Sequence, residues 1–255
     1  KKLTDDIRKI FNDKKYPILI DQEGGRVNRL SNLIDSSNFT GEFFGKLYKK
    51  NIKKFNVYYR VFINQTCYLL DKIGVNINTV PVLDVRHKKS NNNIGNRSFD
   101  SNPKIVSKIG DYFINQFHKN NIATVIKHIP GHGLAKVDSH KSTPIVKSKL
   151  KNLNKIDFLA FKNKKSLFAM TAHIIYQDID KKFTATHSKE VIKLIKNKIK
   201  FNNLLISDDI SMKALKFSIK ENTIKAFKAG CDLVLHCNGK HGEMITVAKN
   251  SPKAN

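Results

Sequence analysis

The sequence is short of cysteine and of long apolar runs. Its three cysteines, Cys67, Cys231 and Cys237, give neither an even disulfide framework nor the paired spacing of a zinc site. No segment reaches the roughly 18 consecutive apolar residues that a membrane-spanning helix needs. We therefore expect reduced thiols, no membrane association and a cytoplasmic location. With 255 residues, 40% of them hydrophobic, the chain can still bury a sizeable core.

Acidic residues and arginine are scarce as well. The 47 basic residues outnumber 21 acidic ones, which gives a net charge of +26 and would normally indicate a polyanionic partner. However, almost all of the basic residues are lysines, and they are spread over the whole chain. Nucleic-acid readers favour the planar fork of arginine and concentrate their charge on one face or arm. We therefore expect no specific nucleic-acid partner, only non-specific binding that is lost near physiological salt.

Short apolar runs alternate with helical patterns along the chain. Strands are expected at residues 17–20, 75–83, 123–126, 166–172, 203–206 and 232–235. The end of a helix is expected at residues 5–12, and one or two longer helices are expected within residues 44–73. Further helices are expected at residues 103–120 after an Asn102 cap, 153–163, 188–200 with Ser188 as the cap, and 213–229 closed by Gly230. This order predicts an α/β fold of parallel strands joined by right-handed crossovers.

Each predicted strand ends in an ionisable residue. In chain order these residues are Asp21, Asp84, Lys127 with His128, His173, Asp208 with Asp209, and His236. A carboxylate after one strand is often only the cap of the next helix. In a parallel barrel all such ends would meet at one mouth, whereas a doubly wound sheet would spread them along an edge.

Ionisable side chains are most concentrated in the 14-residue stretch KHIPGHGLAKVDSH at residues 127–140. Pro130, Gly131 and Gly133 forbid a regular helix there, and the next helical pattern starts only near Lys149. Long ordered loops are usually functional, so we interpret this stretch as an active-site loop. The alternative is a solvated surface loop that happens to contain histidines.

These motifs closely resemble those of bacterial β-N-acetylglucosaminidases of glycoside hydrolase family 3. The matching segments are DQEGGRVNR at residues 21–29, PVLDV at 81–85, NRSF at 96–99, KHIPGHG at 127–133, VDSH at 137–140, MTAHIIY at 170–176 and SDDISM at 207–212. The resemblance covers nearly the whole chain. It implies a (β/α)8 TIM barrel, and because only six strands are found, we expect residues 1–255 to be one catalytic domain that lacks the first two βα units.

The resemblance also implies a role for each motif residue. Asp208 matches the nucleophile of a retaining mechanism, and His140 matches an unusual histidine acid/base on a loop, with Asp138 fixing its tautomer and raising its pKa. The positions that contact N-acetylglucosamine in the family are matched by Asp21, Arg29, Arg97, Lys127 and His128. For His132 and His173 the sequence leaves open whether they contact substrate or only fill the core, and Arg26 could be structural.

Several alternatives remain beside this interpretation. A metal site could use His128, His132, Asp138 and His140, but the zinc-protease pattern needs a helix that Pro130 denies, so we expect no metal and no cofactor. The same site could support phosphorolysis instead of hydrolysis, or the chain could be an inactive truncated homologue. The family's substrate implies a partner of one kind, a small carbohydrate in which N-acetylglucosamine is linked β-1,4 to anhydro-N-acetylmuramic acid in peptidoglycan recycling. We expect a monomer.

Overall fold

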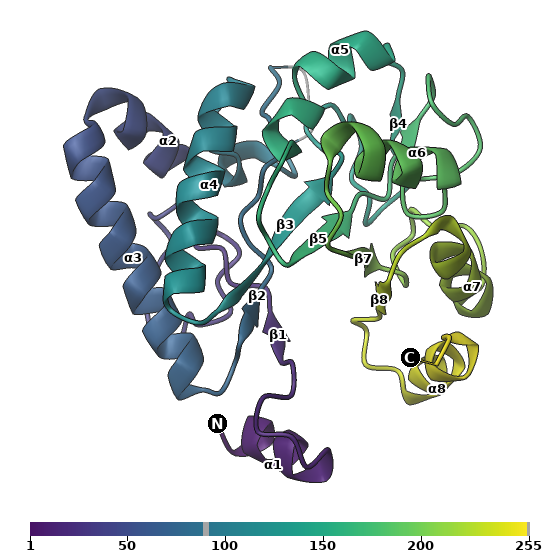
Figure 1. The fold of residues 1–255 in the computed structure, drawn as a ribbon, viewed down its shortest axis with the longest axis horizontal. Coiled ribbons are helices and arrows are strands. Elements are labelled where there is room, and N and C mark those ends of the chain that lie inside the picture. Colours follow the sequence, from purple (N-terminus) through teal and green to yellow (C-terminus); the bar gives the residue numbers. More distant parts are fainter. Residues whose placement is uncertain (89–91, 254–255) are drawn as a thin grey trace.

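The computed structural model describes residues 1–88 and 92–253, and its centre is one parallel sheet (Figure 1). Six strands lie in the order of the sequence: β1 (Leu19–Ile20), β2 (Ile77–Asn78), β3 (Ala123–Ile129), β5 (Phe168–Thr171), β7 (Leu204–Asp209) and β8 (Leu233–Leu235). Every neighbouring pair is parallel. The six strands and their parallel arrangement are as predicted.

Helices surround this sheet. They are α1 (Lys2–Ile10), α2 (Gly41–Lys50), α3 (Ile52–Lys72), α4 (Pro103–Lys119), α5 (Leu150–Lys155), α6 (Lys189–Leu194), α7 (Ile219–Ala229) and α8 (His241–Asn250). The large apolar core lies between sheet and helices, whereas a smaller cluster of Ile77, Val125, Met170 and Ile206 comes from four neighbouring strands. The sheet curls into a half-barrel with β1 and β8 at its edges (Figure 1). Closure of an eight-stranded barrel stays an expectation.

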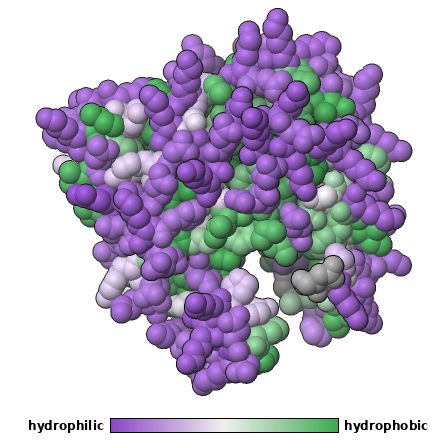
Figure 2. All heavy atoms as spheres, viewed as in Figure 1, coloured by the Kyte–Doolittle hydropathy of each residue, from purple (hydrophilic) through white to green (hydrophobic). Residues whose placement is uncertain are grey.

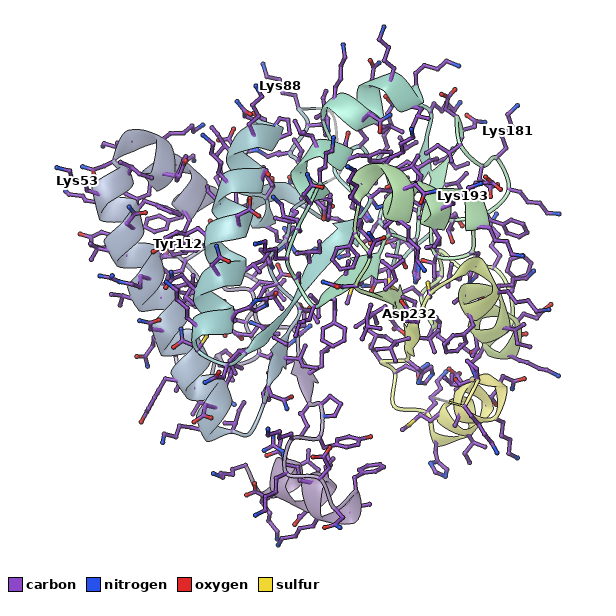
Figure 3. The ribbon with its side chains drawn as sticks, viewed as in Figure 1. Lys53, Lys88, Tyr112, Lys181, Lys193 and Asp232 are labelled. Atoms are coloured by element: carbon purple, nitrogen blue, oxygen red, sulfur yellow. The ribbon has the colours of Figure 1, made fainter. Side chains whose placement is uncertain are left out.

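Polar side chains cover most of the face shown in Figure 2. Figure 2 shows a largely hydrophilic surface, with apolar side chains mainly toward the middle of the view. Of the lysines labelled in Figure 3, Lys53, Lys88 and Lys181 point outward at different sides of the view. The positive charge is therefore dispersed, as the sequence indicated. In the described part of the chain, no helix is both long and apolar enough to cross a membrane.

Three details of the predicted elements were wrong. The helix expected from residue 213 begins only at Ile219, because Ser218 and Glu221 form a capping box there. The helix expected at residues 153–163 is split into α5 and a 3-10 helix (Phe158–Phe161). A separate pair of two-residue strands, β4 (Ile145–Val146) and β6 (Ile175–Tyr176), was not predicted, and it interrupts the segment after the active-site loop. By contrast, Asn102 and Ser188 cap their helices as expected.

A close backbone approach joins α2 to the segment that carries Arg97. A Cβ atom at Gly45 would lie 1.7 Å from the carbonyl oxygen of Phe99, and one at Gly41 would lie 2.1 Å from that of Arg97. Both are much shorter than a van der Waals contact, and both neighbours are backbone atoms, which cannot turn away. Only glycine therefore permits α2 to lie directly against this segment.

We predict that Gly45→Ala lowers the free energy of unfolding by about 2–4 kcal/mol, because α2 must shift away from Phe99. The matched control is Gly242→Ala in α8, where a Cβ atom meets nothing within 4 Å. That variant should be neutral or slightly stabilising, by up to about 1 kcal/mol, because alanine favours helix. Urea unfolding of both variants checks the prediction, and equal effects would contradict it.

Candidate active site

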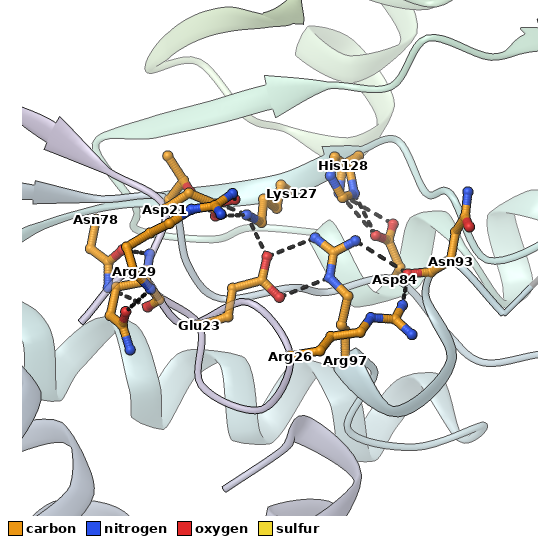
Figure 4. Close-up of polar contacts among 12 residues, drawn as sticks. Asp21, Glu23, Arg26, Arg29, Asn78, Asp84, Asn93, Arg97, Lys127 and His128 are labelled. Carbon is orange, nitrogen blue, oxygen red and sulfur yellow. Dashed lines mark hydrogen bonds and ion pairs between the residues drawn. The ribbon is translucent and has the colours of Figure 1, made fainter. Parts of the chain in front are cut away.

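A buried carboxylate, that of Glu23, lies at the centre of the polar cluster near the strand ends (Figure 4). Arg97 binds it in a bidentate manner, with Nε 2.8 Å from Oε2 and Nη2 2.6 Å from Oε1. Lys127 Nζ lies 2.6 Å from the same Oε1. Burial alone would raise the pKa of Glu23, but Lys127 and Arg97 together hold it well below its ordinary value. Glu23 is therefore an anion that holds two cations in fixed positions.

Lys127 connects the Glu23–Arg97 ion pair to Asp21 at the end of β1. Its side chain is only 2% exposed and also contacts Asp21 Oδ1, while Thr79 Oγ1 accepts a hydrogen bond from Nζ at 3.1 Å. Thr79 in turn donates to Asp21 Oδ1 at 2.5 Å. Arg29 lies at the solvent side of Asp21, with 3.9 Å between Nη2 and Oδ2. Four of the predicted sugar-binding residues, Asp21, Arg29, Arg97 and Lys127, are thus brought together.

The tight turn after Asp21 places Glu23. Gly24 and Gly25 have φ angles of 97° and 58°, a region that side chains disfavour. The Gly24 amide donates to the Val27 carbonyl, and the Val27 amide donates back. The two glycines therefore form a tight turn between Asp21 and Val27.

A second buried carboxylate, Asp84, orients the start of the active-site loop. Its Oδ2 lies 2.7 Å from Nδ1 of His128, and its Oδ1 accepts the backbone amide of His132 at 2.6 Å. Burial would raise the pKa of Asp84, but His128 and His132 hold it below its ordinary value. Because Asp84 occupies Nδ1, the Nε2 atom of His128 is left for a ligand.

The loop after β3 carries the predicted acid/base pair. His140 Nδ1 lies 3.0 Å from Asp138 Oδ1, which also accepts the His140 backbone amide at 2.9 Å. Burial would raise the pKa of Asp138, but these contacts with His140 hold it below its ordinary value. The His140 side chain is 75% exposed, so its Nε2 atom can reach a ligand. The predicted contact between the two side chains is confirmed.

Asp208 lies at the end of β7, and its Oδ1 accepts the backbone amide of Asp209 at 2.8 Å. Burial would raise its pKa, but the nearby His173, His128 and Lys127 hold it below the ordinary value. Asp209 instead accepts hydrogen bonds from the Ser211 amide and hydroxyl and from the Cys237 amide, so it holds the turn after β7.

One open cavity of about 250 Å³ lies between the active-site loop and the end of β7. Three of the predicted sugar-binding residues, Asp21, Arg29 and Lys127, are not among the residues that line it. Its walls include Asp208, His140, Asp138, His128 and Arg97, together with Arg26 and His132. Asp208 and the His140–Asp138 pair therefore face one space, although they are 68 residues or more apart in the chain. Such a cavity can hold a ligand between an anionic carboxylate and an imidazole.

Other strand-end histidines do not join the cavity. His173 is fully buried, with Nδ1 2.7 Å from Thr186 Oγ1 and Nε2 3.0 Å from the Asp209 carbonyl oxygen. It therefore supports β7 rather than contacting substrate. His236 Nε2 lies 2.8 Å from Glu243 Oε2 of α8. Of the six predicted strand ends, His128 and Asp208 line the cavity, and Asp84 bonds to His128. Asp21 and Lys127 pair with each other but do not line it.

The sequence assigned no role to Glu23, and it indicated Asp84 only as one of the strand ends. Both were visible as signals, because Glu23 lies in the first motif and Asp84 ends a strand. Their role depends on burial beside cations and imidazoles, which no motif spacing displays. Arg26, whose role was left open, donates at 2.8 Å to the Asn92 carbonyl oxygen and also lines the cavity.

The pH dependence of stability gives a test of His132. Burial, and then His128, lower its pKa to about 4. In the unfolded chain the His132 side chain has a pKa of about 6.5 and is protonated below that pH. In the native state it is protonated only near pH 4. Between these two pH values the unfolded state therefore binds more protons than the native state. We predict that stability falls as the pH falls through this window, with up to about 3 kcal/mol from His132.

His132→Gln should therefore flatten the dependence of the unfolding free energy on pH between about 6.5 and 4. Urea unfolding at several pH values measures this slope. His241→Gln, which changes an exposed histidine, should leave the slope as in the parent. If both variants keep the parent slope, His132 is not held neutral in the native state.

Comparison with known proteins agrees with this geometry. Residues 1–252 match the model of the glycosyl hydrolase family 3 N terminal domain. A beta-hexosaminidase of Actinobacillus pleuropneumoniae is 33% identical over 252 residues, which cover 92% of this chain and 70% of that protein. One from Haemophilus influenzae strain Rd is 32% identical, over 96% of this chain and 70% of that protein.

Solved structures show the same likeness. NagZ from Neisseria gonorrhoeae, in complex with N-trifluoroacetyl-D-glucosamine, has a TM-score of 0.87 at 26% identity, over 100% of this chain and 74% of that chain. A family 3 beta-N-acetylglucosaminidase from Paenibacillus has a TM-score of 0.86 at 26% identity and covers 98% of this chain. This chain spans about half of the Paenibacillus protein, 48%. The predicted family is confirmed: the chain belongs to glycoside hydrolase family 3.

Proposed function

We propose that this chain is a retaining exo-β-N-acetylglucosaminidase that removes terminal β-linked N-acetylglucosamine. The proposal depends on one observation. Asp208 and the His140–Asp138 pair line the same cavity, together with Arg97 and His128. The relatives named beta-hexosaminidase support the same substrate class. As the natural substrate we propose muropeptide fragments with a β-1,4-linked anhydro-N-acetylmuramic acid aglycone, used in peptidoglycan recycling.

Asp208 would act as the nucleophile. Its lowered pKa keeps the carboxylate ionised at neutral pH, and the end of β7 fixes its backbone. The carboxylate attacks the anomeric carbon while the bond to the leaving-group oxygen breaks, which gives a covalent glycosyl-Asp208 intermediate. Water then attacks the same carbon and releases the sugar with its original configuration.

His140 would supply and recover the proton. The imidazolium donates the Nε2 proton to the departing oxygen, and the neutral ring takes a proton from the attacking water in the second step. Asp138 accepts the hydrogen bond from Nδ1 throughout, so the proton moves only at Nε2. Asp21, Arg29, Arg97, Lys127 and His128 would bind the sugar through its hydroxyl and acetamido groups.

The direct test of the proposal is hydrolysis of an aryl N-acetyl-β-glucosaminide by this chain. Asp208→Asn should reduce kcat by at least about 10³-fold, because the amide cannot form the glycosyl ester. A slow fluorinated substrate should label Asp208 in the parent, and peptide mapping identifies the labelled residue. A label on Asp209 or Asp138 would contradict the assignment. Asp71→Asn, an exposed position on α3, serves as the control.

A second variant tests the acid/base role. His140→Ala should reduce kcat/KM for a disaccharide, whose leaving group needs a proton, about 10²-fold or more, and much less for an aryl glycoside with a good leaving group. Equal losses on both substrates would leave His140 with a structural role only.

Phosphorolysis is the alternative reaction for the same site. Neutral imidazole, unlike a glutamate, does not repel phosphate, so an anionic acceptor could enter. Adding phosphate to the parent enzyme and looking for N-acetylglucosamine 1-phosphate separates the two reactions. We expect water to be the main acceptor.

A further inference from the structure

A histidine and an aspartate outside the cavity form a pair that packs against the active-site loop. His87 Nε2 lies 3.0 Å from Asp157 Oδ1. The two residues come from distant segments, because His87 follows the strand-end motif at residues 81–85 and Asp157 lies between α5 and the 3-10 helix Phe158–Phe161. Neither residue lines the cavity, and none of the roles discussed so far uses this His87–Asp157 pair.

Asp157 is an acidic group inside the protein. The residue is only 1% exposed, and its second carboxyl oxygen, Oδ2, has no hydrogen-bond partner among the described residues. Burial raises the pKa of Asp157, and the contact with His87 offsets only part of this effect. A buried carboxyl group with an unpaired oxygen lowers the stability of the fold. Its presence at this position therefore calls for an explanation other than stability.

The backbone of the active-site loop lies against this pair. A Cβ atom at Gly131 would lie 2.8 Å from the Cβ atom of Asp157. A Cβ atom at Gly133 would lie 3.1 Å from Cδ2 of His87. The fully buried Tyr176 fixes the same turn, because its hydroxyl donates to the Gly131 carbonyl oxygen at 2.6 Å. The pair and the turn are therefore in direct contact, with no loop side chain between them.

The same turn continues to the acid/base residues. His132, between the two glycines, lines the cavity, and its backbone amide donates to Asp84 Oδ1 at 2.6 Å. The His132 ring reaches further along the loop, with Nε2 3.3 Å from Ser139 Oγ. Ser139 is the chain neighbour of both Asp138 and His140. A shift of the turn would therefore move His132 and, through Ser139, the His140–Asp138 pair.

We propose that the His87–Asp157 pair positions the active-site loop, so that the imidazole of His140 faces the leaving group. The two residues act through the Gly131 turn and through His132, and they touch neither the substrate nor the reacting atoms. This inference rests on the proposed function, in which His140 is the acid/base, and it adds the residues on which the placement of His140 depends.

The sugar-binding side of the turn is held by other contacts. Asp84 bonds to the His128 ring and to the His132 amide, and neither contact involves the His87–Asp157 pair. Loss of the pair should therefore impair proton transfer to the leaving group much more than it impairs binding of the sugar. This separation distinguishes a positioning role from a general loss of stability.

The test variant is His87→Ala, which removes one partner of Asp157 from the less buried end of the pair, where the His87 side chain is 20% exposed. It should reduce kcat/KM about tenfold for an N-acetylglucosaminyl disaccharide, because a misplaced acid transfers its proton poorly. For an aryl glycoside with a good leaving group the loss should be at most about twofold. Binding of N-acetylglucosamine in an NMR titration should stay within about twofold of the parent.

A conservative variant and a matched control complete the test. His87→Gln keeps a side-chain N–H that can donate to Asp157, so it should recover activity on the disaccharide to within about threefold of the parent. His118→Ala also removes a partly buried histidine, whose Nε2 lies 3.1 Å from Thr124 Oγ1 near the start of β3, at the other end of the sheet. Any loss in this control should be equal for the two substrates.

Equal losses of His87→Ala on both substrates, no loss at all, or a His87→Gln variant as impaired as His87→Ala would overturn the inference. If the parent hydrolyses neither substrate, the proposed function has failed instead. The pair is then tested by the NMR signals of the His132 and His140 ring protons, which should shift in His87→Ala but not in His118→Ala. Unchanged signals in a folded His87→Ala variant would overturn the inference without reference to activity.

Discussion

The structure of the site depends on one constraint, the neutralisation of Glu23 inside the protein. A buried carboxylate is costly unless it is paired, and here Arg97 and Lys127 pair with it from two other segments of the chain. Lys127 also depends on this pairing, because its side chain is almost completely buried and needs negatively charged partners. Glu23 pairs with both cations, and Lys127 also pairs with Asp21, so the groups proposed to bind the sugar are held in place by the same interactions that allow them to be buried.

The fixed and the exposed parts of the site differ as a result. Arg97 and His128 line the cavity and are held from behind by Glu23 and Asp84, so the proposed sugar contacts need no rearrangement. His140 is exposed and belongs to a loop, and Asp138 is its only side-chain partner among the contacts found in the described residues. This division suits the proposed chemistry, in which the bound sugar stays fixed while the acid/base must accommodate departing and arriving groups.

The sequence predicted which side chains meet in the cavity better than it predicted the scaffold's details. Asp208, His140 and Asp138 were visible because strand ends and a loop rich in Gly and Pro are local signals, and family motifs strengthened them. Glu23 and Asp84 were not assigned, since their importance comes from burial beside partners 44 to 104 residues away. The late start of α7 was missed for a similar reason: the segment before Ser218 is fixed by Ala214 bonding to Ser139 of the active-site loop, a tertiary contact that helical periodicity cannot show.

The central claim is that Glu23 positions the groups that bind the sugar, and binding of N-acetylglucosamine to Glu23→Gln tests it most directly. Glutamine keeps the shape but not the charge, and Glu190→Gln on the exposed face of α6 is the matched control. The account predicts that a still folded Glu23→Gln variant binds N-acetylglucosamine at least about tenfold more weakly in an NMR titration, a loss of roughly 1.4 kcal/mol. Unchanged affinity in a folded Glu23→Gln variant would contradict it.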